Sequence, residues 1–576
     1  MRISRIPPHL RKPVLAAGVL ALLVGGAVFL FRGWDRQVED RLGRWAAEQV
    51  ARRTDGAYRL TLGDVAFLPL AGSISFDSLV VRTDSVRNAR RGSPLPRLEW
   101  RGGDCRVTGL DVPGLLLRKS FNAAELGCAR VLVSLTLTGP DGKGAGAADS
   151  AGAPVAPEDV GRTLGLRSVR VGEISFPAFG LRLVRPGERG GSSIALDSAR
   201  LEVNDLHFDP AASPGSGKAL SADRARLTAT GVLFRPDTLI ELAVARLEAG
   251  FTDSTLGMAG VRHEPTIPER EWLRRVRVRR DRIAFELDTL EARGFAWRGF
   301  VGAGEVGMRV LELGGLRFDV LSDRRIPRGR PRRHRTPQQV AAGRGPSLRV
   351  DTLRVAGGSI AYRERRPGAA RPGRVVFEAL RATMTDLEMP ARGTPLRVAA
   401  RAKVMGEGEL QAEATVPLDA PDFRYDLSGR LGPMRAAAFN RFLSENESFE
   451  FDEGMIDAVE FRQTVRDGLA RTTLTPRYRD LSVEPTGEGG GIVASVKRTV
   501  TRFIANALVV RSRNPADDGD DLRIARTARV YDPANTWIQF LWLSMRDALT
   551  EGLQEHPDED DDADGRKDRE RRSPKP

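Results

Sequence analysis

The sequence predicts a mainly β fold, an elongated repetitive β-sheet or β-groove with an N-terminal transmembrane helix and C-terminal amphipathic helices. Three observations indicate this class. A short apolar pattern recurs along the chain, one long segment near the N-terminus carries no charge, and 60 glycines with 35 prolines suit a chain with many turns. The 576 residues suffice for several hydrophobic cores or for one long repetitive core.

The uncharged segment comprises residues 14–31, which are rich in Leu, Val and Ala. Its 18 residues would span roughly 27 Å as a helix, close to the thickness of the bilayer hydrocarbon. No signal-peptidase cleavage site of the small-x-small type follows it, so an uncleaved anchor is favoured over a cleaved signal peptide. Basic residues lie on both sides, and long domains are translocated largely regardless of charge. We therefore expect a single-pass protein of the bacterial inner membrane, with the N-terminus in the cytoplasm and most of the chain in the periplasm.

Changes in composition divide the chain into eight predicted parts. They are a cytoplasmic N-terminus (1–13), the transmembrane anchor (14–31), a juxtamembrane helix (32–57), a first β-rich repeat region (58–138), a flexible linker (139–157), a β-rich repeat domain (158–490), C-terminal helices with a strand (491–555), and a disordered charged tail (556–576). The C-terminal helices are expected at 491–510 and 535–554, the second capped by Asn535 or Thr536.

The recurring pattern has two apolar pairs separated by two residues, apolar-x-apolar-x-x-apolar-x-apolar. Nine copies are recognised, starting at Leu60, Cys105, Val169, Leu201, Leu227, Phe285, Leu311, Leu348 and Ala382. A regular strand alternates with a period of two, so the extra residue would turn the second pair to the opposite face. A β-bulge corrects this slip, and the inserted dipeptides are rich in Gly, Asn and Asp, which tolerate bulge geometry. We therefore predict bulged strands whose two apolar pairs share one face.

Three glycines followed by further apolar pairs suggest tight turns within the repeat. These are Gly72, Gly180 and Gly358, and each is expected to form the turn of a hairpin. The two cysteines, Cys105 and Cys128, are expected to form a disulfide between adjacent strands, with two separate buried thiols as the alternative.

The net charge of +14 permits polyanionic partners, but most of the basic residues are arginines spread along the chain. Seven arginines fall within residues 324–335 without interleaved aromatic residues, which favours a solvated loop over a nucleic-acid site. None of the five histidines has metal-site spacing, and neither a phosphate-binding loop nor a nucleophile elbow is present. We predict a protein that is not an enzyme, without cofactor, metal or nucleic-acid partner.

Two regions resemble the AsmA-like family of bacterial envelope proteins, in particular a branch described as a domain of unknown function. The first runs from the anchor to the strings Leu60-Thr-Leu-Gly-Asp-Val-Ala-Phe67 and Gly72-Ser-Ile-Ser-Phe76. The second includes Tyr425-Asp-Leu-Ser-Gly-Arg-Leu-Gly432, Phe439-Asn-Arg-Phe442, Tyr478-Arg-Asp-Leu-Ser482, Phe503-Ile-Ala-Asn-Ala-Leu-Val-Val-Arg-Ser512, Asn514-Pro515 and Asp532-Pro533. Larger relatives such as TamB form a long β-groove thought to carry lipids across the periplasm. The resemblance implies a role in envelope lipid handling or outer-membrane assembly, and it implies no catalytic residues.

The predicted partners are therefore the membrane, a phospholipid or other envelope lipid, and envelope proteins. The alternative is a structural or partner-binding scaffold whose apolar face is filled by its own side chains. The candidate lipid-facing residues are the apolar members of the repeat, namely Phe67, Val169, Val171, Ile174, Phe176, Phe208, Phe234, Leu316, Phe318, Leu353 and Val355.

The predicted topology is tested by cysteine-accessibility labelling. A cysteine introduced at a surface position after residue 57 should react with an impermeant maleimide in intact spheroplasts, because the periplasmic face is open to the reagent. A cysteine within residues 1–13 should react only after lysis. The reverse labelling pattern would contradict the orientation.

Overall fold

The computed structural model describes residues 44, 47–48, 50–52, 56–68, 72–90, 97–136, 167–185, 192–209, 220–235, 239–297, 299–300, 305–327, 329, 333–343, 347–447, 449–485, 511–516 and 520–553. These residues are mainly β, with 22 strands in one mixed sheet, two strands in a second sheet, and few helices. The chain forms two compact units. The first comprises residues 1–267, 284–315 and 345–353, and the second comprises 268–283, 316–344 and 354–576.

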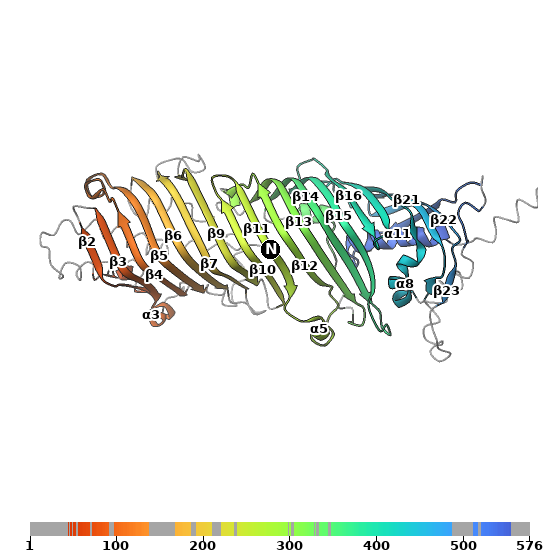
Figure 1. The fold of residues 1–576 in the computed structure, drawn as a ribbon, viewed down its shortest axis with the longest axis horizontal. Helices are drawn as coiled ribbons and strands as arrows, with labels where there is room; N and C mark the ends of the chain where they lie inside the picture. The colour runs from red at the N-terminus through yellow and green to blue at the C-terminus, as the bar shows by residue number, and fades with distance from the viewer. Residues whose placement is uncertain are drawn as a thin grey trace, which may run out of the picture. The chain divides into compact units, whose positions relative to one another are not determined.

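The strands of the first unit follow one another in chain order (Figure 1). They are β1 (Tyr58–Leu62), β2 (Val65–Leu68), β3 (Ser73–Thr83), β4 (Arg97–Thr108), β5 (Ser120–Thr136), β6 (Ser168–Arg185), β7 (Ser192–Phe208), β8 (Leu220–Ser221), β9 (Arg224–Arg235), β10 (Ile240–Gly250), β11 (Thr255–Pro265) and most of β12 (Arg282–Arg293). Strands β3, β4 and β5 pair antiparallel, β5 pairs parallel with β6, and β6, β7, β9, β10, β11 and β12 again pair antiparallel. Short helices α3 (Ser85–Ala89) and η3 (Gly114–Arg118) lie in the connections.

Strands β12, β13 (Val306–Asp323) and β14 (Leu348–Arg365) contribute residues to both units. The other strands of the second unit are β15 (Gly373–Met389), β16 (Leu396–Val404), β17 (Gly408–Val416), β18 (Tyr425–Leu431), β19 (Met434–Arg435), β20 (Phe449–Phe451), β21 (Met455–Arg466), β22 (Leu469–Arg479), β23 (Val483–Pro485) and β24 (Ala525–Val530). Its helices are α5 (Glu269–Arg275), α7 (Pro337–Ala341), η4 (Ala436–Phe439), α8 (Asn440–Asn446) and α11 (Trp537–Leu553). Strands β15 to β18 pair antiparallel in order and continue through β21 and β22 to β24.

Strand β6 confirms the predicted phase correction. Val169 and Ile174 belong to the two apolar pairs on either side of the inserted dipeptide, and both pack against the same buried cluster, which includes Val171. The intervening Arg170 and Glu173 are exposed. Both apolar pairs of this copy therefore share one face, as predicted. The predicted bulge at Gly172 and Glu173 is wrong, because the register with β5 and β7 is continuous there, and the register shifts against β7 lie between Phe176 and Leu181.

Left-handed backbone conformations occur within the inserted dipeptides. Five of the nine dipeptides hold a residue with φ between 51° and 64°, at Gly109, Asp205, Gly231, Gly315 and Asp386. Gly231 on β9 lies between Thr230 and Val232, which pair with Ser198 and Leu196 of β7. A Cβ at Gly231 would collide with the side chain of Asp197 on β7. Glycine is therefore required here both by the positive φ and by the close approach of the neighbouring strand.

Two of the three predicted hairpins are wrong. Gly72 does precede β3 in the hairpin formed with β2, where Phe67 pairs with Ile74. Gly180 and Gly358 instead lie inside the continuous strands β6 and β14. The sheet tolerates glycine in both strands because a neighbouring strand approaches closely. A Cβ at Gly358 would lie 2.6 Å from the carbonyl oxygen of Leu316.

The predicted anchor at residues 14–31, the linker at 139–157, the helix at 491–510 and the tail at 556–576 lie outside the described residues. Among the residues that are described, no helix is long and apolar enough to cross a membrane. The described part of the juxtamembrane segment is helical at Arg44, Ala47, Glu48 and 50–52, and Val50 is buried in the cluster formed by β1 to β6.

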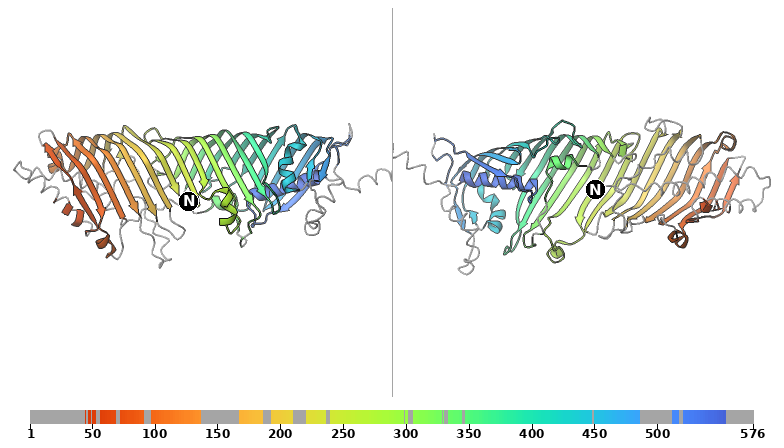
Figure 2. Two further views of the ribbon diagram at one scale, coloured as in Figure 1. Left: turned by 60° about the horizontal axis from the view of Figure 1, so that its bottom comes forward. Right: turned by 180° about the vertical axis from the view of Figure 1, so that it is seen from behind.

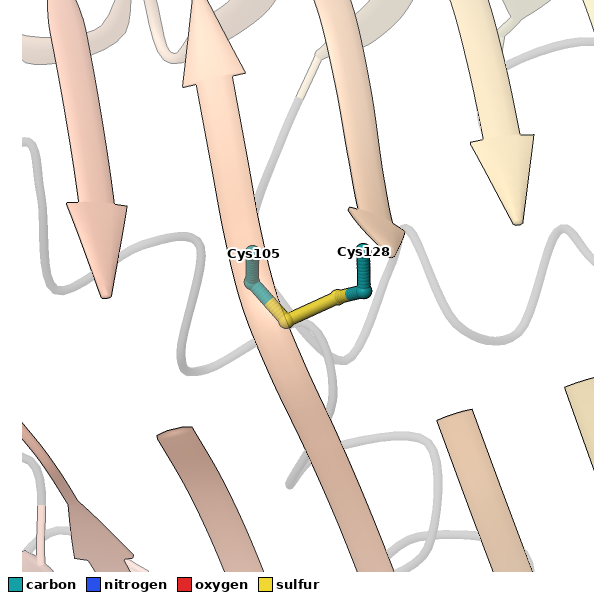
Figure 3. Close-up of a disulfide and its surroundings, with 2 residues drawn as sticks. All are labelled: Cys105 and Cys128. Atoms are coloured by element: carbon teal, nitrogen blue, oxygen red, sulfur yellow. A yellow bond between two sulfur atoms is a disulfide. The ribbon is translucent and has the colours of Figure 1, made fainter. Parts of the chain in front are cut away.

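Figure 3 shows the disulfide between Cys105 of β4 and Cys128 of β5. The two cysteines are direct partners in the antiparallel register, and their Cα atoms are 3.9 Å apart. This arrangement agrees with the predicted link between adjacent strands. Both residues are buried in the same apolar cluster as Val107 and Phe76.

Helix α11 lies against β22 and β24 (Figure 2). Its predicted cap is confirmed, since the Thr536 hydroxyl oxygen accepts a hydrogen bond from the backbone N–H of Gln539 at 3.2 Å. The face turned to the sheet carries Phe540, Ser544, Ala548 and Gly552 at intervals of four residues, and all four are buried. The small residues at the last three of these positions allow the helix axis to approach the strands closely.

The positive φ of Gly231 on β9 leads to a prediction about stability. Gly231→Ala should lower the free energy of unfolding by about 2 kcal/mol, because a side chain disfavours positive φ and meets Asp197. Gly257→Ala on β11 is the matched control, since its Cβ would have no neighbour nearer than 4.0 Å and its φ is not positive. Denaturant unfolding measures both, and equal losses in the two variants would contradict the role of backbone conformation.

Candidate functional site

One face of the first unit carries apolar side chains in four cross-strand rows. Each row crosses the six strands β6, β7, β9, β10, β11 and β12 through direct register partners. The rows are Phe176-Leu201-Leu227-Ala249-Leu256-Ala292, Phe179-Ala199-Ala229-Leu247-Met258-Leu290, Leu181-Leu196-Val232-Val244-Val261-Leu287 and Leu183-Ile194-Phe234-Leu242-His263-Phe285. We call this surface the apolar face. Of its 24 positions, only His263 is not apolar.

The apolar face is covered only in part. Seven of its positions are buried, and these are mostly small residues, namely Ala199, Ala229, Ala249, Ala292, Val244, Val261 and Leu287. The other positions, including all of its phenylalanines, are half-buried. The strands at the N-terminal end of the unit differ, since Leu79 and Val81 of β3 are 1% and 0% exposed. The apolar side chains are thus enclosed around β3 and partly accessible from β6 to β12.

The opposite face of the same strands is charged and exposed. Arg246 and Glu248 of β10 flank Leu247, and their side chains are 68% and 53% exposed. Arg262 of β11 donates to Glu286 of β12 at 3.1 Å, again near the surface. Exposed pairs of this kind contribute little to stability, but they keep this face in water. The two faces therefore differ sharply in polarity.

His263 is the single ionisable side chain in the four rows. Its ring stacks on that of Phe285, with the centroids 4.9 Å apart and an interplanar angle of 22°. Burial lowers the pKa of His263, because the apolar surroundings disfavour the charged imidazolium. At neutral pH the ring is therefore uncharged, and the apolar face carries no net charge.

The structure assigns the predicted lipid-facing residues to different surroundings. Phe176 and Phe234 lie in the four rows, and Val169 and Ile174 are half-buried beside them. Val171, Phe208 and Val355 are buried, so they offer little surface to a ligand. Leu353 is half-buried in the first unit, and Leu316 and Phe318 are half-buried in the second. The backbone of Phe67 pairs with Ile74, and its side chain lies outside the described residues.

Sequence reasoning missed three strand segments that complete the apolar face. Leu242, Val244, Leu247 and Ala249 of β10 have the spacing of the repeat, as do Ile194, Leu196, Ala199 and Leu201 of β7. Leu256, Met258, Val261 and His263 of β11 follow it with a histidine at the last place. The signal was present in all three. An alanine in two of them and a histidine in the third made the pattern less apparent.

A second candidate is a charged network in the second unit. Glu364 is 3% exposed and accepts hydrogen bonds from Arg324 at 2.6 Å and from the Tyr362 hydroxyl at 2.8 Å. Arg363 binds both Asp319 and Glu269, and Asp323, also 3% exposed, accepts from Arg325 at 2.6 Å. The Arg324 and Arg325 side chains of the predicted solvated loop are thus partly buried ion-pair partners.

The pKa shifts in this network follow from the same contacts. Burial raises the pKa of Tyr362, and the charge of Glu364 raises it further. Burial alone would also raise the pKa of Asp323, but the hydrogen bonds and charge of Arg325 outweigh it and hold that pKa below 3.8. The ionised Asp323 therefore stabilises the fold above its ordinary pKa, and this contribution is lost as the pH falls through the lowered value. Each buried carboxylate has an arginine partner, which indicates a structural role.

The described residues contain no group of three or more His, Cys, Asp or Glu arranged to hold a metal ion. In comparisons with known proteins, no family model and no curated protein matches this chain. The extent of the apolar face and its partial exposure make it the candidate site.

The charged network makes a prediction for the second unit. Glu364→Leu should lower its free energy of unfolding by about 3 kcal/mol, because Arg324 and Tyr362 lose their shared acceptor. Asp426→Asn is the control, since Asp426 pairs with Arg466 while the two side chains are 52% and 42% exposed, and its loss should cost less than about 1 kcal/mol. Hydrogen exchange of the β14 amides measures the effect. Unchanged protection in Glu364→Leu would show that the network adds no stability.

Proposed function

We propose that this chain is a membrane-anchored periplasmic envelope protein of the AsmA-like type, and that its apolar face shields lipid acyl chains from water. The anchor expected at residues 14–31 would hold the chain at the inner membrane. The role in lipid handling or outer-membrane assembly rests on the family resemblance, and the site rests on the four apolar rows.

The observation that carries the proposal is the partial exposure of the four rows. Seventeen of their 24 positions are half-buried, over six neighbouring strands. Six strands spaced about 4.8 Å apart cover roughly 24 Å. One leaflet of a bilayer has a hydrocarbon thickness of about 15 Å. A row is thus long enough to lie along a whole acyl chain.

The mechanism would be passive. Each methylene of an acyl chain moved from water onto an apolar surface gains about 0.8 kcal/mol. The gain is similar at every row, because the rows offer the same chemistry from strand to strand. A lipid could therefore shift along the face without a large barrier, while its polar headgroup stays in water. No cofactor and no covalent step is required.

The alternative is a scaffold whose apolar face is filled by its own side chains. The observation in its favour is the burial of Val244, Val261 and Leu287, which are neighbours in one row and are 5–6% exposed. In that case the half-buried residues would form the margin of a closed core.

Photocrosslinking distinguishes the carrier from the scaffold. A benzophenone amino acid replacing Leu247 in the full-length protein should form adducts with phospholipid in cells, because Leu247 lies in the second row. The same residue replacing Arg246, on the exposed charged face of β10, should not. Mass spectrometry of the purified protein identifies the adducts. Equal yields at both positions, or none at Leu247, would refute lipid binding at this face.

Substitution by aspartate is a second test that distinguishes the lipid carrier from the closed scaffold. Phe234→Asp should abolish lipid binding in the carrier and leave the fold intact, since a charge at a half-buried site can reach water. Leu79→Asp should unfold the first unit, because Leu79 is 1% exposed. Thermal melts compare the two variants. Unfolding by both would favour the closed scaffold.

A further inference from the structure

A second exposed apolar surface lies on the first half of α11. Trp537, Ile538 and Trp542 are 38%, 61% and 44% exposed, although they belong to the same helix whose other face packs on β22 and β24. Single exposed apolar residues are ordinary on protein surfaces. Ile538 and Trp542 are neighbours one turn apart and form a patch that needs another explanation, whereas Trp537 lies at the start of the buried stripe, seven residues before Ser544.

The exposed stripe is set by the helical period. Ile538, Trp542 and Arg546 follow one another at intervals of four residues and therefore lie on one side of α11. The buried stripe of Phe540, Ser544 and Ala548 lies on the other side. The ring of Trp542 is held by an edge contact with Phe442 of α8, with centroids 6.5 Å apart. The position of Trp542 in the patch is therefore fixed by packing within the second unit.

Basic residues lie near the turn that leads into α11, and Arg546 lies on the stripe itself. The backbone N–H of His334 donates to the carbonyl oxygen of Pro533 at 2.8 Å, and the Tyr531 hydroxyl donates to the carbonyl oxygen of His334. These bonds hold the exposed Arg333 and Arg335 beside the turn that leads into α11. In the described part of the chain, neither guanidinium group is paired with a carboxylate, and the same holds for Arg546. The one acidic neighbour in the turn, Asp532, accepts from the backbone of Ala534.

We propose that Ile538 and Trp542, with Arg333, Arg335 and Arg546, form a docking surface for an anionic phospholipid bilayer. Tryptophan favours the membrane–water interface because its ring is apolar while its N–H needs a polar partner. Arginine can lay its apolar stem along the acyl region and keep its charge among the phosphates. The surface would bind flat against a bilayer, independently of any lipid on the apolar face of the first unit.

Depth-sensitive fluorescence tests this surface in the full-length protein held in amphipol. The variant Ile538→Cys carries an NBD label, and the control variant Val86→Cys carries the same label on α3, where the native side chain is 63% exposed. Vesicles of phosphatidylcholine with phosphatidylglycerol should shift the emission at position 538 to the blue and allow quenching by doxyl-labelled lipid. Vesicles of phosphatidylcholine alone should have little effect, and position 86 should not respond to either.

Charge variants make the test quantitative. Replacing Arg333, Arg335 and Arg546 by glutamine should weaken the response at position 538 by about 100-fold in lipid concentration, since each basic residue near an anionic surface contributes about fivefold. These side chains are exposed, so the variant should retain its melting behaviour. Trp542→Ser should weaken the response without removing its dependence on phosphatidylglycerol.

Three results would overturn the proposal. Equal quenching at positions 86 and 538 would show that the rest of the chain brings the label to the bilayer. A response to both kinds of vesicle that the glutamine variant leaves unchanged would show that charge plays no part. A blue shift at position 538 that rises with protein concentration in the absence of vesicles would assign the surface to contact between copies of the chain.

Discussion

The constraint on which the rest of the structure depends is the extra residue in the middle of each strand. A strand of eight or more residues with strict alternation needs no such correction, but these strands carry two apolar pairs out of phase. The left-handed conformation at Gly231, and at Gly260 on β11, restores the phase on strands whose neighbours lack a positive φ at the matching position. From β7 to β12 the extra residues face one another, and register shifts between Phe176 and Leu181 align β6 with β7, so the apolar pairs stay in line and the four rows form. The polarity of both faces of the first unit follows from this local backbone geometry.

The two units differ in where their charged side chains lie. In the first unit the charged residues of β10 and β11 remain at the surface, and their ion pairs are exposed. In the second unit Glu364 and Asp323 are buried and are neutralised by Arg324 and Arg325, which lie in the turn that follows β13. A buried carboxylate is tolerated only with such partners, so the arginine-rich composition of the segment starting at residue 324 has a structural origin at Arg324 and Arg325. The remaining described arginines of that segment, Arg333 and Arg335, are exposed.

Much of the fold could be predicted from the sequence, because its signals are local. The shared face of the apolar pairs in β6, the strand pair joined by Cys105 and Cys128, and the helix capped by Thr536 all follow from short patterns with a direct physical meaning. The register between strands could not be predicted, and the apolar face is a property of register, since Ala199 and Leu247 count as members only when aligned with Ala229. Gly180 was mistaken for a turn because a glycine that relieves crowding within a strand has the same sequence signal as one that ends it. The charged network was missed because its partners are distant in sequence, as Glu269 is from Arg363.

The parallel pair between β5 and β6 has a consequence for how the chain folds. Antiparallel neighbours such as β9, β10 and β11 are joined by short turns, so their contacts form between residues close in sequence and little loop entropy is lost. The parallel pairing of Ser120 with Ser168 and of Thr136 with Val184 requires the chain to return along the full length of a strand before a single bond is made. The strands up to β5, of which β4 and β5 are joined by the disulfide, can therefore form through contacts among themselves. The strands from β6 onward can form independently of them. Within the first unit their association closes the longest loop between paired strands, and it is the natural boundary between cooperative folding units there.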